Sequence, residues 1–120
     1  MIKRILIADD EPLTCFLISQ ALECVCDFHG EINIVRNGKD AIREISRCAY
    51  TICFLDMNLP DLNGMDVLKD IKKISPETNI VVMTEGSVSD NMNRTIEGYA
   101  SLLASKPIDL FQIKTFIKQT

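Results

Sequence analysis

The chain has 120 residues, of which 47% are hydrophobic and 25% are charged, and this composition is typical of one soluble globular domain. Thirteen basic and seventeen acidic residues give a formal net charge of −4, which argues against direct binding to nucleic acid or to an anionic membrane. No apolar run approaches the ~20 residues of a membrane span or forms a signal-peptide core, so we expect a cytoplasmic protein.

The five cysteines are predicted to be free thiols. Their number is odd and no export signal precedes them, so a disulfide framework is not expected. Cys24, Cys26 and His29 are close enough in sequence to be metal ligands, but no second ligand pair completes a zinc-like site. The cysteines are therefore expected to pack as small hydrophobic side chains.

The hydrophobic pattern alternates between strands and helices along the whole chain. Short apolar runs rich in β-branched residues predict strands at residues 5–8, 32–35, 51–55, 80–83 and 102–104. Helical spacing predicts a helix from Pro12, one after Gly38, one ending near Ser75, a weaker one over residues 87–97 and one after Asp109.

The same spacing predicts which helical residues face the core. In the first helix, these are Leu13, Leu17, Ala21 and Cys24, which follow one another at intervals of four, four and three. The corresponding residues of the second, third and last helices are Ala41, Ile45 and Cys48, then Val67, Leu68, Ile71 and Ile74, then Leu110, Ile113 and Ile117. Asp109 with Gln112 three residues later resembles a capping box at the start of the last helix.

Alternating strands and helices predict an α/β fold, a doubly wound parallel sheet with helices on both faces. Ligands of such sheets bind beyond the carboxyl ends of the strands. If the strand order is 2-1-3-4-5, the first and third strands are neighbours, and the acids that follow them converge. The polar residues at the predicted strand ends are Asp9, Asp10, Glu11, Asp56, Thr84 and Lys106.

These strand-end residues have the chemistry of phosphoryl transfer to a carboxylate. Two carboxylates ~4 Å apart repel by about 4 kcal/mol at an effective dielectric constant of ~20, so a cluster of them needs a cation. Carboxylates with water suit Mg²⁺, while Lys106 adds a positive charge and Thr84 a hydroxyl donor. Each residue alone also fits an ordinary loop or strand end, but their joint placement favours a site.

Four segments, at residues 5–12, 54–64, 81–84 and 105–107, make the whole chain resemble the receiver domain of two-component response regulators. The second is the most specific, because Asp56 ends a strand and is followed by Pro60 and Gly64, four and eight residues later. The resemblance implies a flavodoxin-like (βα)5 fold with strand order 2-1-3-4-5. It also implies that residues 1–120 form a single receiver domain without an output domain.

The resemblance implies that Asp56 accepts a phosphoryl group from a phosphohistidine of a sensor histidine kinase or phosphotransfer protein. Lys106 would pair with the phosphoryl oxygens, and the Thr84 hydroxyl would donate a hydrogen bond to one of them. Water can later hydrolyse the acyl phosphate, so the domain would be a timed switch rather than a turnover enzyme. The implied Mg²⁺ ligands are Asp9, Asp10, Asp56 and the backbone carbonyl oxygen of Asn58.

In the family, phosphorylation shifts the face made by the fourth helix, the fifth strand and the fifth helix, and a downstream protein binds there. The sequence departs from the family pattern at Leu103, where an aromatic residue is usual, and at Tyr99, where glycine is frequent. It also departs at Glu85, where a small residue usually follows the threonine, and Gly86 follows. Glu85 would repel a phosphodonor if it points into the pocket, and would have no such effect if it is turned to solvent.

Two functional hypotheses follow. The first is a phospho-accepting signalling switch. The second is a receiver-like protein-interaction module that is never phosphorylated, its pocket either retained or disabled by Glu85 and Leu103. A phosphohydrolase of the aspartate-nucleophile type is disfavoured, because residues 9–13 do not match its Asp-x-Asp-x-Thr/Ser motif.

Overall fold

The computed structural model describes residues 2–120, which form strands and helices in alternation. The strands are β1 (Arg4–Ala8), β2 (Glu31–Val35), β3 (Ile52–Asp56), β4 (Asn79–Glu85) and β5 (Leu102–Lys106). The helices are α1 (Pro12–Gln20), its π-helical continuation η1 (Ala21–Val25), α2 (Gly38–Arg47), α3 (Gly64–Ile74), α4 (Asp90–Glu97) and α5 (Leu110–Gln119).

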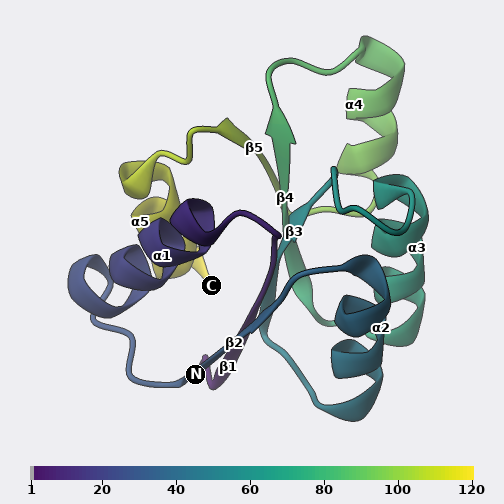
Figure 1. The fold of residues 1–120 in the computed structure, drawn as a ribbon. Helices are drawn as coiled ribbons and strands as arrows, with labels where there is room; N and C mark the ends of the chain where they lie inside the picture. Colours follow the sequence, from purple (N-terminus) through teal and green to yellow (C-terminus); the bar gives the residue numbers. More distant parts are fainter. Residues whose placement is uncertain (1) are drawn as a thin grey trace.

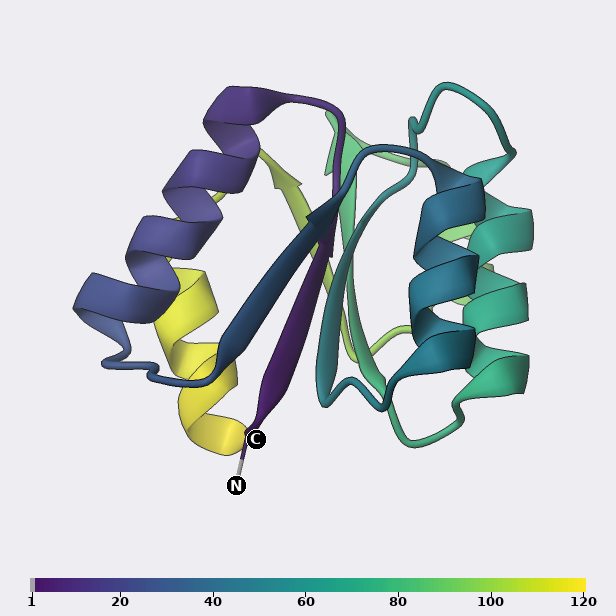
Figure 2. The same cartoon turned by 60° about the horizontal axis from the view of Figure 1, so that its bottom comes forward.

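The strands form one sheet in the order β2-β1-β3-β4-β5, and every neighbouring pair is parallel. Helices α1 and α5 cover one face of this sheet, and α2, α3 and α4 cover the other (Figures 1 and 2). Each face has its own layer of buried hydrophobic side chains. The predicted doubly wound parallel sheet and its strand order are confirmed.

The central strands are buried on both faces, as their continuous apolar sequences predict. Ile5 to Ala8 of β1 are completely buried, and so are all five residues of β3. Because both faces of these strands are buried, a shift in their pairing register would move side chains out of their packed positions and is therefore unfavourable. The residues at their carboxyl ends are therefore held in fixed relative positions.

The predicted buried face of the first helix is confirmed at Ala21, only half-buried at Leu17, and wrong at Leu13 and Cys24. Cys15, Ile18 and Leu22 are buried, whereas Leu13 is 69% exposed and Cys24 is exposed. Apolar residues lie on nearly all sides of α1, so their spacing cannot select the face that meets the sheet. The wider π-helical turn η1 then changes the register of the residues after Gln20.

The faces predicted for the other helices are confirmed at their centres and fail at their ends. The buried positions are Ala41 and Ile45 in α2, Val67, Leu68 and Ile71 in α3, and Ile113 in α5. Ile74, the last residue of α3, and Leu110, the first residue of α5, are exposed. Ile117 is half-buried and packs against the core. Cys48 follows α2 and is half-buried.

The start of α5 has a simpler cap than the sequence suggests. The Asp109 side chain accepts a hydrogen bond from the Phe111 backbone N–H at 2.9 Å. Among residues 2–120, Gln112 makes no return bond to Asp109. Asp109 caps the helix through the second helical residue and not through the third, so the predicted capping box does not form. This bond still satisfies one of the N–H groups that a helix start leaves free.

The cysteines are free, as predicted, and Cys15 and Cys53 are buried. Complete burial raises the pKa of the Cys53 thiol to about 12, so it stays protonated at neutral pH. None of the helices between residues 2 and 120 has the length and apolarity that a membrane crossing requires.

Gly64 fixes the loop that follows β3. A Cβ atom at this position would lie 2.4 Å from the Met57 carbonyl oxygen and 2.8 Å from the Met57 Cα atom. The start of α3 therefore packs directly on the backbone of the residue after Asp56. This contact explains why a glycine stands eight residues after the strand-end acid.

We expect Gly64→Ala to lower the free energy of unfolding by about 2 kcal/mol, because the added methyl group overlaps backbone that cannot rotate away. Gly98→Ala is the matched control, since the nearest atom to its Cβ is 3.4 Å away, and it should change stability by less than about 1 kcal/mol. Urea denaturation of both variants measures the difference. Equal effects would contradict the close packing of Gly64.

Candidate functional site

The carboxyl edge of the sheet carries a group of buried polar side chains. Asp56 is the last residue of β3, Asp9 directly follows β1, and Thr84 lies near the end of β4. These three residues are 2%, 0% and 5% exposed, respectively. Burial of acids is unfavourable unless their charge is compensated, so this edge is the candidate functional site.

Lys106, the last residue of β5, provides this compensation. Its Nζ atom lies 2.9 Å from Asp9 Oδ2 and 3.2 Å from Asp56 Oδ2, and it also pairs with the Glu11 carboxylate. Three carboxylates thus meet one ammonium group, whose side chain is itself mostly buried. The cluster keeps an excess of negative charge.

The pKa values of Lys106 and Asp9 follow from this arrangement. Burial alone would lower the pKa of Lys106, but its hydrogen bonds and charge interactions with Glu11, Asp9 and Asp56 outweigh burial and raise this pKa. The ammonium group therefore stays charged at neutral pH. Burial raises the pKa of Asp9, against the opposing effects of the Glu11 backbone N–H and of Lys106.

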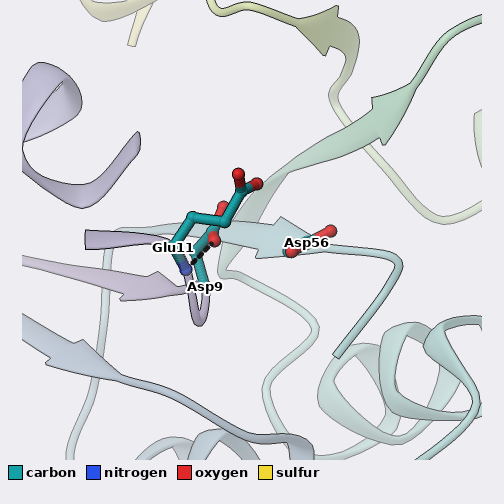
Figure 3. Close-up of side chains that lie close together, drawn as sticks. All are labelled: Asp9, Glu11 and Asp56. Atoms are coloured by element: carbon teal, nitrogen blue, oxygen red, sulfur yellow. Dashed lines mark hydrogen bonds between the residues drawn. The ribbon is translucent and has the colours of Figure 1, made fainter. Parts of the chain in front are cut away.

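Both aspartates are oriented by the chain that follows them. Asp9 Oδ1 accepts the Glu11 backbone N–H at 2.8 Å, and Asp56 Oδ1 accepts the Asn58 backbone N–H at 2.9 Å. Figure 3 shows the bond to Glu11 and the neighbouring positions of the three carboxylates. In each aspartate, the second oxygen is left to face Lys106.

The carboxylates fit a hard divalent cation. Carboxylate oxygens of Asp9, Glu11 and Asp56 all lie within 4.8 Å of one another. Asp9 Oδ2 is fully buried, and the Lys106 ammonium group lies 2.9 Å from it as its ion-pair partner. An oxygen in this state is suited to coordinate a cation, and an all-oxygen set favours Mg²⁺.

The acidic cluster differs from the set expected from the sequence at two positions. Asp10 is exposed and lies outside the cluster, whereas Glu11, which was not expected to be a metal ligand, belongs to it. Asn58 is exposed, and its backbone N–H is bonded to Asp56. The signal for Glu11 was its position two residues after a strand-end aspartate, where an Asx-type turn brings residue i+2 back beside residue i.

Thr84 is beside the cluster but is not bonded to it. Its hydroxyl donates to the Gly86 carbonyl oxygen at 3.2 Å. Gly86 has a φ of +73°, a left-handed conformation that suits glycine and turns the chain at the end of β4. Leu103 is half-buried and packs with Tyr99 against the core layer under α2, α3 and α4.

The loop after β3 is also anchored to α2. The Asp61 carboxylate accepts the backbone N–H groups of Gly38 and Lys39, at 2.7 and 3.0 Å. The Gly38 bond is the largest of the effects that lower the pKa of Asp61. An acid at a helix N-terminus is favourable, and here it holds the loop between Asp56 and α3.

The comparisons with known proteins agree with this geometry. The family model of the response regulator receiver domain matches residues 5–118. The regulatory protein LuxO of Vibrio cholerae is 38% identical over 88 residues, which are 72% of this chain and 19% of LuxO. The chain thus spans only a small part of that relative's length.

Solved structures show the same fold. A signal receiver domain from Vibrio parahaemolyticus is 28% identical, with a TM-score of 0.85 over 99% of this chain and 89% of that one. The receiver domain of a sensor histidine kinase from Pseudomonas aeruginosa is 18% identical, with a TM-score of 0.82 over 99% of this chain and 97% of that one. That structure is described with a magnesium ion coordinated in its active-site cleft.

The family match includes all five strands and the polar residues at their carboxyl ends. Together with the strand order, it shows that the chain belongs to the response regulator receiver domains of two-component signalling.

Proposed function

We propose that the chain is a phospho-accepting switch, and that Asp56 takes a phosphoryl group from a phosphohistidine of a sensor histidine kinase or phosphotransfer protein. The observation that carries this proposal is the state of the Asp56 carboxylate. It is buried, with one oxygen held by the Asn58 N–H and the other 3.2 Å from Lys106 Nζ. An oriented carboxylate beside a fixed positive charge is suited to attack phosphorus.

In this step, an Asp56 oxygen forms a bond to phosphorus while the phosphorus–nitrogen bond breaks. The electron pair of that bond stays on the imidazole nitrogen, which takes up a proton. Lys106 is placed to balance the charge of the transferred group, because it already contacts Asp56. Water later hydrolyses the acyl phosphate, so the chain acts as a switch rather than as a turnover enzyme.

We propose that Mg²⁺ binds at this edge of the sheet with Asp9, Asp10, Asp56 and the Asn58 carbonyl oxygen as its ligands, of which Asp10 lies outside the acidic cluster. The buried Asp9 Oδ2, which already faces a cationic group in Lys106, supports this assignment, and so does the magnesium ion described for the related receiver domain from Pseudomonas aeruginosa. When bound, the ion would neutralise negative charge on the carboxylates and on the transferred group. Glu11 competes with Asp10 for a place among the ligands, because it is the acid that the cluster contains.

The output requires a structural change at Thr84. Its hydroxyl must leave the Gly86 carbonyl oxygen in order to donate to a phosphoryl oxygen. We propose that this exchange shifts the balance between two conformations of the face formed by α4, β5 and α5, and that a downstream protein binds to this face. We propose that this occurs in the cytoplasm, without direct contact to nucleic acid or membrane.

Asp56→Asn should abolish phosphorylation, because the amide has no nucleophilic carboxylate oxygen. The measurement is the intact mass after incubation with Mg²⁺ and acetyl phosphate, where the wild type should gain one phosphoryl group. Asp66→Asn, an exposed acid in the first turn of α3, is the control and should be labelled like the wild type. Phosphorylation of Asp56→Asn would contradict the assignment of Asp56 as the acceptor.

The wild type also tests the alternative function. If neither acetyl phosphate nor any phosphohistidine donor phosphorylates it, the result would favour the interaction module that is never phosphorylated.

Asp9→Asn should weaken Mg²⁺ binding by roughly 10-fold or more, because it removes a buried negative charge that faces the cluster. Calorimetric titration with Mg²⁺ measures this change. Glu11→Gln and Asp10→Asn, titrated in parallel, show which of the two acids is the third carboxylate ligand. Unchanged affinity in Asp9→Asn would contradict the metal site.

Lys106→Ala should leave Mg²⁺ binding intact or make it tighter, because the carboxylates lose the cation that competes for them. Without Mg²⁺, the variant should lose about 3 kcal/mol of stability, since buried acids are left uncompensated. Thermal unfolding with and without Mg²⁺ tests both points, and Mg²⁺ should restore most of the loss. Loss of metal binding in this variant would show that Lys106 and the ion do not have separate roles.

A further inference from the structure

We infer that Glu85 selects the phosphodonor by charge. It disfavours small donors that carry only negative charge, and it favours a protein donor with Lys or Arg beside its phosphohistidine. This inference rests on the proposed phosphorylation of Asp56 and adds to it the chemistry of the donor.

The strand register places Glu85 on the same face of the sheet as Asp56 and Lys106. In the strand register, Glu85 of β4 lies opposite Lys106 of β5. Met83, two residues earlier in β4, lies opposite Asp56 of β3. Paired residues of parallel strands have side chains on the same face, and alternate residues of one strand share a face. Glu85, Lys106 and Asp56 therefore lie on one face of the sheet.

Glu85 also lies between the two hollows at this edge. One hollow, of about 320 Å³, is lined by Glu85 together with Glu11 and Lys106. The other, of about 270 Å³, is lined by Glu85 together with Asn58 and Thr84. Each hollow also includes a residue that contacts Asp56, since Lys106 lies 3.2 Å from its carboxylate and the Asn58 N–H donates to it. Glu85 is therefore close to Asp56 on both sides.

The charge of Glu85 is not neutralised by the protein. Within residues 2–120, its carboxylate forms no ion pair and accepts no hydrogen bond. The residue is exposed, but it lines both hollows and so is not simply turned away from the site. Behind it, three carboxylates already face the single ammonium group of Lys106. An arriving phosphoryl group, which is itself anionic, therefore meets an additional negative charge at the entrance.

This charge affects the two classes of donor in opposite directions. Acetyl phosphate brings only negative charge, so Glu85 lowers its local concentration and slows its reaction. A protein donor can place a Lys or Arg beside its phosphohistidine, and this cation would pair with Glu85 during the encounter. A repulsive element of this kind gives specificity by excluding the wrong donor.

The first test measures the initial rate of phosphoryl incorporation from acetyl phosphate and Mg²⁺ by intact mass. In this reaction an Asp56 oxygen bonds to phosphorus, and acetate leaves with the electron pair of the broken phosphorus–oxygen bond. Glu85→Gln should react roughly 3- to 10-fold faster than the wild type at low ionic strength. The difference should approach zero near 1 M NaCl, where the screening length is only ~3 Å.

The matched control is Glu77→Gln. Glu77 is also exposed, but it precedes the amino end of β4, whereas Glu85 stands at the carboxyl end of the same strand. This variant should react like the wild type at every ionic strength. An acceleration that is equal in Glu77→Gln, or one that does not depend on salt, would overturn the inference, because neither result would come from the local charge of Glu85.

The second test compares two phosphohistidine peptides, one flanked by lysines and one flanked by serines. The wild type should prefer the lysine peptide, and Glu85→Gln should lose most of this preference. An unchanged preference would overturn the inference while Asp56 labelling still supports the proposed function. A wild type that none of these donors labels would overturn the proposed function itself, and the inference with it.

Discussion

The organisation of this protein depends on one interaction, the contact of the Lys106 ammonium group with three carboxylates at the carboxyl edge of the sheet. Asp9 and Asp56 are buried, and without a cation their mutual repulsion would oppose the closure of this edge. Lys106 joins the ends of β1, β3 and β5, which are not all neighbours in the sheet. The same lysine is in contact with the carboxylate that we propose to be phosphorylated.

The site is rigid where it must position atoms. Asp56 is held by the Asn58 N–H, Gly64 packs on Met57, and Asp61 ties the intervening loop to α2. The loop after β3 therefore has several independent anchors within a few residues of Asp56. Such preorganisation would keep the carboxylate oriented during the proposed phosphoryl transfer.

The site is adjustable at the end of β4. The Thr84 hydroxyl makes one hydrogen bond, to the Gly86 carbonyl oxygen. The side chain of Glu85, the residue between them, is exposed and forms no hydrogen bond or ion pair with any of the described residues. A weakly held hydroxyl can change partner at small cost in free energy, which a two-state switch requires. Leu103, at the position where the family usually has an aromatic residue, packs against the same core layer as Tyr99.

The sequence alone determined the alternation of strands and helices, the polar residues at the strand ends and the glycine in the loop after β3. These features depend on apolar runs, side-chain periodicity and turn chemistry, which are local properties of the sequence. It did not determine which face of α1 is buried, because apolar residues surround that helix and only the docked sheet selects Cys15 and Ile18 over Leu13. It did not show that Glu11, and not Asp10, joins the acidic cluster. That choice depends on how the chain turns after β1 and on where Lys106 arrives from β5, and a contact between residues 95 positions apart exists only in the folded protein.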